Sequence, residues 1–109
     1  MNTMEISSSL EDYLEAIAEI IDRNQHAHSK DIAEKLGVST PSVSNALQAL
    51  AARSLIRYRP HSPVTLTARG LKLANVIRHR HAVMKKFFAG ILKLSDSEAD
   101  DFACKAEHI

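Results

Sequence analysis

Apolar residues recur at helical spacing near the start of the chain. The stretch runs from Leu10 to about Arg23, and we expect Ser8 or Ser9 to cap it. Its apolar stripe comprises Leu10, Tyr13, Leu14, Ile17, Ile20 and Ile21. At roughly 100° per residue, Asp12, Glu15 and Glu19 fall on nearly the opposite side. The pattern predicts a helix that packs through its apolar stripe, with acids that either bind a ligand or face water.

Two shorter helices follow, separated by a glycine-containing turn. Ser29 is the expected cap of a helix ending at Leu36, Gly37 can end it in the left-handed conformation, and Val38 is the expected apolar plug of the turn. Ser39 or Thr40 then caps a helix over residues 42–53, with Pro41 at its start. Its expected buried side comprises Val43, Ala46, Leu47 and Leu50, and its polar side comprises Ser42, Ser44, Asn45 and Gln48. This arrangement is typical of a DNA-reading helix-turn-helix, although a hairpin whose polar face meets water has the same pattern.

Residues 55–59 and 64–67 alternate apolar with polar or basic positions, which is the period of a half-buried strand. Two strands directly after a recognition helix form a wing. Arg57, Arg59 and His61 would lie on this wing, where cations meet DNA phosphates, unless they are only a solvated strand face.

A long helical pattern then runs from residue 68 to about residue 92, with Thr67 as its cap. Its second half is rich in large apolar groups, which predicts a dimerising region. A further helix with a capping-box pattern starts at Ser95. The expected fold is mostly α with a small β-wing: a winged helix-turn-helix DNA-binding domain over residues 1–68, then long dimerisation helices over residues 69–109. The helical pattern is still running at Ile109, so we expect the native chain to continue.

Composition is that of an ordinary globular protein, with 45% hydrophobic and 25% charged residues and a formal net charge of +1. The charge is unevenly distributed, because residues 53–86 hold Arg53, Arg57, Arg59, Arg69, Lys72, Arg78, Arg80, Lys85 and Lys86 and no acid. One cysteine is ordinary in a reducing cytoplasm, where we expect the protein to act. No apolar run reaches the roughly 18 residues of a membrane span.

Candidate metal ligands lie at both ends of the chain. Cys104, Glu107 and His108 would share one helix face, and Asp12 and Glu15 make a second pair one turn apart. A thiol, an imidazole and carboxylates together suit a first-row transition metal better than Ca²⁺ or Mg²⁺. His79 and His81 point to opposite sides of the long helix, and by geometry His81 faces inward.

These motifs resemble the metal-dependent repressors of the diphtheria toxin repressor and manganese transport regulator type. The similarity covers the chain from Ser9 to Ile109. It rests on residues 10–17, on Asp31–Leu36 with Val38, Ser39 and Pro41–Ser44, on Leu66, Thr67 and Gly70, on Arg80 and His81, and on Cys104, Glu107 and His108. The motifs of the first and last helices are specific, whereas the helix-turn-helix alone is not.

The resemblance implies a homodimeric winged-helix repressor that binds Fe²⁺ or Mn²⁺ and then a palindromic operator in double-stranded DNA. Position by position, it implies the metal ligands Asp12, Glu15, His81, Cys104, Glu107 and His108. The DNA-binding residues predicted from the helix-turn-helix and wing patterns are Ser39, Thr40, Pro41, Ser42, Ser44, Asn45, Gln48, Arg57 and Arg59.

The metal and the functional class stay open at this point. Asp12 is typical of manganese-type members, but Cys104 is typical of iron-type members, and a thiolate favours Fe²⁺. Lys85 and Asp100 replace a carboxylate and a histidine of the iron-type second site. A metal-independent winged-helix regulator and a protein-interaction module are the alternatives. A thiol enzyme is disfavoured because Cys104 and His108 share one helix without nearby oxyanion donors.

Overall fold

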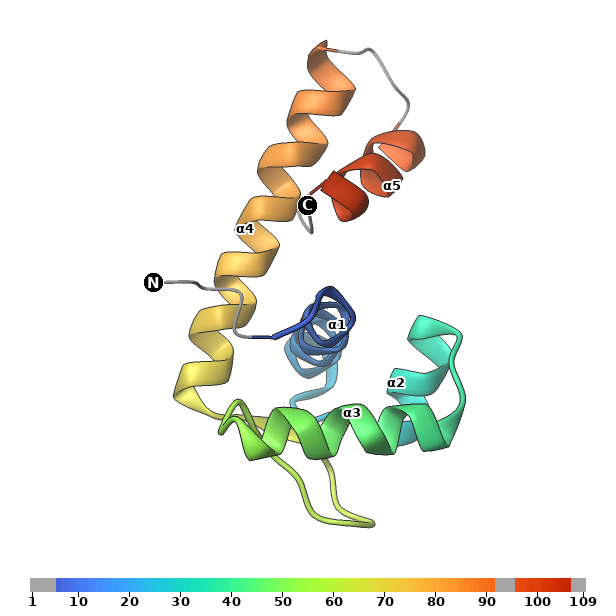
Figure 1. Ribbon diagram of the computed structural model, residues 1–109, viewed down its shortest axis with the longest axis vertical. Coiled ribbons are helices and arrows are strands. Elements are labelled where there is room, and N and C mark those ends of the chain that lie inside the picture. The colour runs from blue at the N-terminus through green and yellow to red at the C-terminus, as the bar shows by residue number, and fades with distance from the viewer. Residues whose placement is uncertain (1–5, 92–95, 107–109) are drawn as a thin grey trace. The chain divides into compact units, whose positions relative to one another are not determined.

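The computed structural model describes residues 6–91 and 96–106, without the side chains of Asp96, Ala99 and Phe102. Helices α1 to α3 are followed by a two-stranded sheet and by helices α4 and α5 (Figure 1). This order confirms the predicted mostly helical fold with a small β-wing. The chain divides into two compact units, Met1–Ala74 and Asn75–Ile109.

Three helices build the core of the first unit: α1 (Ser8–Asn24), α2 (Ser29–Leu36) and α3 (Thr40–Ala52). Each contacts the other two, and α3 runs lengthwise below the end of α1 in Figure 1. Their large, fully buried apolar side chains are Leu14, Ile17, Ile32, Val43, Leu47 and Leu50. Burying an aliphatic side chain of this size stabilises a fold by about 1.5–3 kcal/mol. The apolar stripes predicted for α1 and α3 are therefore the ones that pack.

Two predicted helix caps were wrong by one residue. The cap of α1 is Ser7, whose Oγ accepts the backbone N–H of Leu10 at 3.2 Å, so Ser8 already lies within the helix. The cap of α2 is His28, which makes no side-chain capping hydrogen bond. The residue before it, Ala27, instead pairs with Val64 of the wing through backbone hydrogen bonds in both directions. This bridge fixes the start of α2 without a serine cap.

The turn between α2 and α3 is held mainly by its backbone. Gly37 has φ 66° and ψ 39°, the left-handed conformation predicted for it. The N–H groups of Gly37 and Val38 both donate to the carbonyl of Ala33. The side chain of Val38 is 37% exposed, so its predicted role as an apolar plug was wrong. Ser39 caps α3 as expected, since its Oγ accepts the N–H of Ser42.

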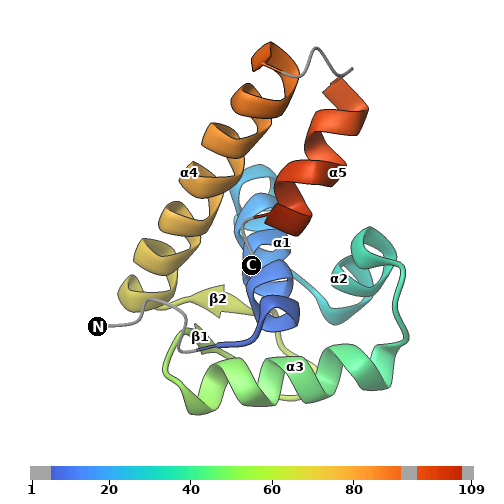
Figure 2. The ribbon, with the colours of Figure 1, turned by 45° about the horizontal axis from the view of Figure 1, so that its top comes forward.

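The wing consists of β1 (Ile56–Arg57) and β2 (Thr65–Leu66), shorter than the predicted stretches. They pair antiparallel, with Ile56 opposite Leu66 and Arg57 opposite Thr65 (Figure 2). The connecting loop extends beyond α3 in Figure 1. The base of the wing is buried through Leu55, Ile56 and Val64, so the wing is anchored to the same core that positions α3.

Helix α4 (Ala68–Ile91) begins directly after Thr67, whose side chain hydrogen-bonds both the helix and the segment before β1. Thr67 Oγ1 accepts the N–H of Gly70 at 3.0 Å and donates to the carbonyl of Ser54 at 2.7 Å. Gly70 itself packs against the backbone of Leu55. The first turn of α4 therefore has a fixed position on the first unit.

In the second unit, α4 from Asn75 onward and α5 (Asp96–Ala106) lie side by side in both ribbon views (Figures 1 and 2). Ile77 and Ala103 are fully buried. Val83, Phe87 and Ile91 are among the large apolar side chains that are exposed. The capping box predicted at Ser95 begins outside the described residues.

Candidate DNA interface and metal ligands

The predicted reading face of α3 points away from the core. Thr40, Pro41, Ser42, Asn45 and Gln48 are exposed and Ser44 is half-buried. Amides and hydroxyls of this kind can hydrogen-bond base edges in the major groove of DNA. Ser39 has a structural role as well, because its Oγ caps the helix and lies 2.9 Å from Ser42 Oγ.

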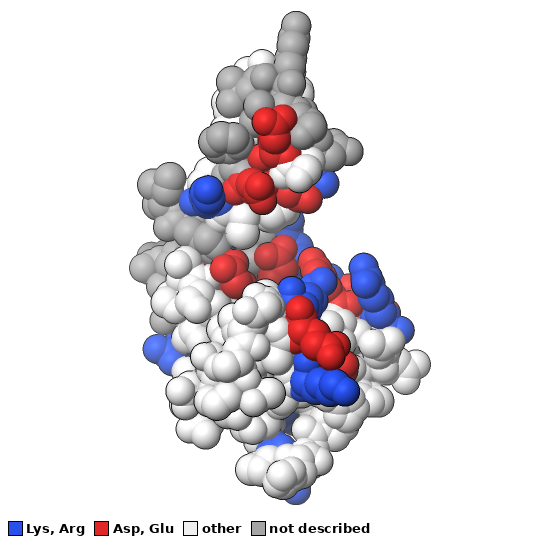
Figure 3. Space-filling view, turned by 90° about the vertical axis from the view of Figure 1, so that its right-hand side faces the viewer, with Lys and Arg blue, Asp and Glu red and all other residues white. Residues whose placement is uncertain are grey.

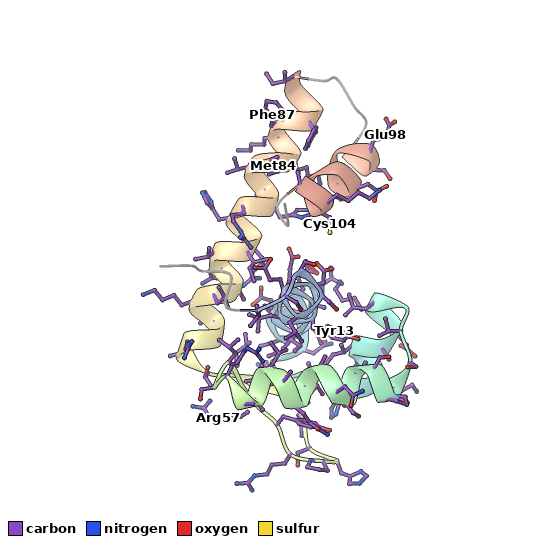
Figure 4. All side chains as sticks on the ribbon, viewed as in Figure 1. Tyr13, Arg57, Met84, Phe87, Glu98 and Cys104 are labelled. Carbon is purple, nitrogen blue, oxygen red and sulfur yellow. The ribbon has the colours of Figure 1, made fainter. Side chains whose placement is uncertain are left out.

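The two wing arginines differ in their surroundings. Arg57 lies at the base of the wing, and its Nη1 donates to the carbonyl of Leu66 on the facing strand at 3.3 Å (Figure 4). Arg59 is exposed further along the wing. An exposed guanidinium beside a reading helix suits a DNA phosphate. Arg57 therefore stabilises the wing, and Arg59 is the simpler probe of phosphate contact.

A polar groove of about 420 Å³ lies beside α3, between the start of α2 and the wing. It is lined by His28, Ser29, Ser44, Tyr58, Pro60, His61 and Ser62. Hydroxyl and imidazole groups can donate hydrogen bonds to phosphate oxygens. Except for Ser44 and the wing residue His61, none of these residues was predicted from the sequence to contact DNA. No sequence signal marks them, because the bridge between Ala27 and Val64 brings them together.

The face seen in Figure 3 is not uniformly basic. On the face seen in Figure 3, Lys and Arg side chains lie among Asp and Glu side chains. Lys35 and Glu19 form an ion pair, in which Nζ and Oε2 are 3.0 Å apart. The features that suit DNA are therefore the individual polar and basic side chains of α3 and the wing.

The first unit carries two of the predicted metal ligands. Asp12 and Glu15 are half-buried on α1, one turn apart. The adjacent Glu11 is fully buried, which the sequence pattern did not indicate. Asp12 and Glu15 are thus neither core residues nor fully solvated, and a carboxylate pair of this kind can bind a divalent cation.

The second unit carries His81 on α4 and Cys104 on α5, and both side chains are half-buried. Figure 4 shows Cys104 on α5. His79 is exposed, in agreement with the expectation that His81 is the inward histidine. His81 Nε2 lies 2.9 Å from Asp100 Oδ1, and Lys85 Nζ lies 3.5 Å from the same oxygen. The hydrogen bond from His81 lowers the pKa of Asp100, burial opposes this shift, and the charge of Lys85 adds to it.

The predicted ligand set is not assembled among the described residues. Within residues 6–91 and 96–106, no group of three or more His, Cys, Asp or Glu side chains is placed to hold a metal ion. Glu107 and His108 lie outside the described residues, and the other four predicted ligands are divided between the two units. The complete set therefore stays a prediction. Within the described chain, no helix is both long and apolar enough to cross a membrane.

Two sequence models of one family match nearly the whole chain. Residues 5–64 match the iron dependent repressor N-terminal DNA binding domain, and residues 67–109 match the iron dependent repressor metal binding and dimerisation domain. The two matches meet close to the start of α4.

Individual relatives agree with this assignment. An uncharacterized HTH-type transcriptional regulator of Methanocaldococcus jannaschii is 33% identical over 94% of this chain and 83% of its own length. The transcriptional regulator MntR of Escherichia coli O157:H7 is 41% identical over 72% of this chain and 50% of its own length. The structure of the manganese regulator SloR is similar with a TM-score of 0.79 and 31% identity, over 91% of this chain and 46% of SloR.

The chain thus spans about half the length of MntR and SloR. The exposed polar face of α3, the wing and the helices after it agree with both family models. Members of this family are repressors and not enzymes. This chain belongs to the iron-dependent repressor family of metal-responsive, DNA-binding transcription regulators.

Proposed function

We propose that this chain is a repressor that binds DNA as a homodimer when it holds Fe²⁺ or Mn²⁺, and that it acts in the cytoplasm. Residues 1–68 read a palindromic operator and supply two of the metal ligands, and residues 69–109 supply the other ligands and dimerise. The observation that carries the proposal is the division of the predicted ligands: Asp12 and Glu15 belong to the unit that contains α3, whereas His81 and Cys104 belong to the other.

The donor chemistry fits a first-row divalent metal. Asp12 and Glu15 would supply carboxylate oxygen, Cys104 a thiolate and His81 an imidazole nitrogen, with Glu107 and His108 completing the set. Ca²⁺ and Mg²⁺ prefer oxygen ligands only. The hydrogen bond from His81 to a carboxylate is also typical of histidines that bind metals. When bound, the metal supplies positive charge and a coordination geometry that the acidic and neutral donors lack by themselves.

The proposed mechanism is linkage between metal binding and DNA binding. In the absence of metal, the negative charges of Asp12, Glu15 and Glu107 would oppose the formation of a shared site. A ligand set drawn from both units favours one arrangement of the reading helix relative to the dimer. A metal shifts the population toward the DNA-binding state only as far as it binds that state more tightly. In a dimer on a palindrome, the two reading helices would be about 34 Å apart, one turn of DNA.

Exposed apolar side chains on α4 support the proposal that the chain dimerises. Val83, Phe87 and Ile91 are 51%, 48% and 67% exposed and follow one another at helical spacing. Exposed apolar side chains on one helix face are typical of a protein interface. The shared dimerisation domain of the family makes a second copy of this chain the proposed partner.

The test is a double substitution, Glu15→Ala with Glu107→Ala, in a DNA-binding titration. DNA ligands are first selected from a random duplex pool with the Mn²⁺-loaded protein. We expect the unsubstituted chain to bind this DNA more tightly with Mn²⁺ or Fe²⁺ than with a chelator, and the double variant to lose that difference.

Glu19→Ala is the matched control, because Glu19 is a half-buried acid on the same helix and pairs with Lys35. It should retain the metal dependence. If the double variant responds to metal as the unsubstituted chain does, the ligand assignment is wrong. Equal DNA affinity of the unsubstituted chain with metal and with chelator would instead favour a metal-independent winged-helix regulator.

A further inference from the structure

Asp100 makes a specific contact with one nitrogen of the His81 ring. Its Oδ1 lies 2.9 Å from Nε2 of His81, and the two residues come from α5 and α4 of the same unit. The His81 side chain is 22% exposed, whereas that of Asp100 is 50% exposed. The histidine is thus the more buried partner and the carboxylate reaches it from the solvent side.

The chemistry of the pair determines which ring nitrogen carries hydrogen. An ionised carboxylate can only accept a hydrogen bond, so Nε2 of His81 must donate. In a neutral imidazole with hydrogen on Nε2, the lone pair available to a cation is on Nδ1. Asp100 therefore favours one of the two neutral tautomers of His81.

Lys85 stabilises the carboxylate in this position. It lies one turn along α4 from His81, and its Nζ is 3.5 Å from the same Oδ1. Two groups of α4 thus bind one oxygen of α5, which limits the rotation of the carboxylate. A nearby ammonium also makes this oxygen unfavourable for a divalent cation, because like charges repel. Asp100 is therefore poorly suited to bind a metal itself.

We propose that Asp100 is a positioning residue, which holds His81 in the tautomer and orientation that present Nδ1 to the divalent metal. This inference rests on the proposed function, since it gives His81 the role of a ligand. Neither the predicted ligand set nor the family descriptions assign a role to Asp100. Removal of a carboxylate that orients a metal-binding histidine typically lowers metal affinity about 10- to 100-fold.

The experiment compares Asp100→Ala with Asp101→Ala in the whole chain. Asp101 is exposed on the same helix, so both variants lose one negative charge and long-range electrostatics are matched. Asp100→Asn is a third variant, because the amide oxygen can still accept from Nε2 without carrying charge.

The first readout needs no metal. Long-range ¹H–¹⁵N correlation spectra of the histidine rings, recorded at mildly alkaline pH where imidazole is neutral, report the tautomer of His81. We expect the Nε2–H tautomer in the unsubstituted chain and in Asp101→Ala, and a mixture of tautomers in Asp100→Ala. Asp100→Asn should retain part of the preference. A mixture in the unsubstituted chain would overturn the proposal.

The second readout is affinity for Co²⁺, followed by its visible absorption. Asp100→Ala should bind Co²⁺ about 10- to 100-fold more weakly than Asp101→Ala. Equal affinities of these two variants would overturn the positioning role while leaving the metal site intact. If the unsubstituted chain does not bind Co²⁺, Mn²⁺ or Fe²⁺, both the proposed function and this inference fail. The two kinds of failure are therefore distinguishable.

Discussion

Gly70 packs so closely against Leu55 that a Cβ atom at position 70 would overlap the carbonyl oxygen of Leu55 and lie 2.8 Å from its carbonyl carbon. Both partners are backbone, so the clash cannot be relieved by rotating a side chain. Forcing extra volume into a packed contact costs about 1–3 kcal/mol. We expect Gly70→Ala to lower the free energy of unfolding by this amount in urea denaturation.

Gly90→Ala is the control for this substitution, because Gly90 lies in the same helix and a Cβ atom added there would meet no described neighbour within 4 Å. Alanine in a helix interior is more stable than glycine by about 0.5–1 kcal/mol, and at Gly90, next to the last described residue of α4, we expect a gain of at most this size. The two substitutions should therefore have opposite signs. A stabilising effect at both positions would show that helix propensity, and not contact with Leu55, determines the result at Gly70.

The sequence predicted the elements that rest on local periodicity and missed those that rest on long-range pairing. The stripe of α1, the turn at Gly37 and the buried side of α3 each follow from a repeat or from one residue with a special conformation. The start of α2 could not be predicted in this way, because it depends on pairing between Ala27 and Val64, which are far apart in the sequence.

In the candidate site, too, the sequence predicted local features and missed a contact between distant residues. The donors at the two ends of the chain were visible as residue types at helical spacing. The contact between His81 and Asp100 was not, because it depends on how α5 packs beside α4. Burial of Glu11 was also unexpected, since an acid on an amphipathic helix usually faces water.

Ser39 should contribute to stability independently of any role in DNA binding. Its Oγ accepts the N–H of Ser42, one of the backbone donors that the first turn of α3 leaves unpaired. Ser39→Ala should lower the free energy of unfolding by about 1 kcal/mol. Ser29→Ala is the comparison, because α2 has His28 as its cap and Ser29 is already helical. Ser29→Ala should change the free energy of unfolding by less than about 0.5 kcal/mol, roughly the difference in helix propensity between serine and alanine.

Phe87→Glu should weaken the proposed dimer. Phe87 is 48% exposed on α4, and a charge there would be buried by a second copy of the chain. A central aromatic contact is worth about 2 kcal/mol or more, which is roughly 30-fold in the dissociation constant. Sedimentation equilibrium measures this constant directly. Leu71→Glu, at an apolar position that is 45% exposed on the first unit, should leave it unchanged. If both variants raise the dissociation constant equally, the dimer interface is not formed specifically by this face of α4.

Arg59→Gln should weaken DNA binding by about the same factor on every sequence. A side chain that contacts only phosphate carries no base information, so its loss removes one counterion released on binding. The slope of log affinity against log salt should therefore fall by about 0.9. Arg57 is a poorer choice, because it also donates to the carbonyl of Leu66 and its loss would disturb the wing. An unchanged slope would exclude Arg59 from the phosphate contacts.

Gln48→Ala should change the sequence preference of DNA binding and not its salt dependence, in contrast to Arg59→Gln. Gln48 is exposed on α3, and its amide can pair with the edge of adenine in the major groove. Its loss should reduce affinity for selected DNA by about 1–3 kcal/mol and leave the salt slope unchanged. Selection from a random pool with the variant should then show a relaxed preference at one base pair in each half of the proposed palindrome. If Gln48→Ala instead lowers affinity equally on selected and unrelated DNA, this part of α3 contacts the backbone. The bases would then be read by Asn45 and the residues before it, closer to the start of the helix.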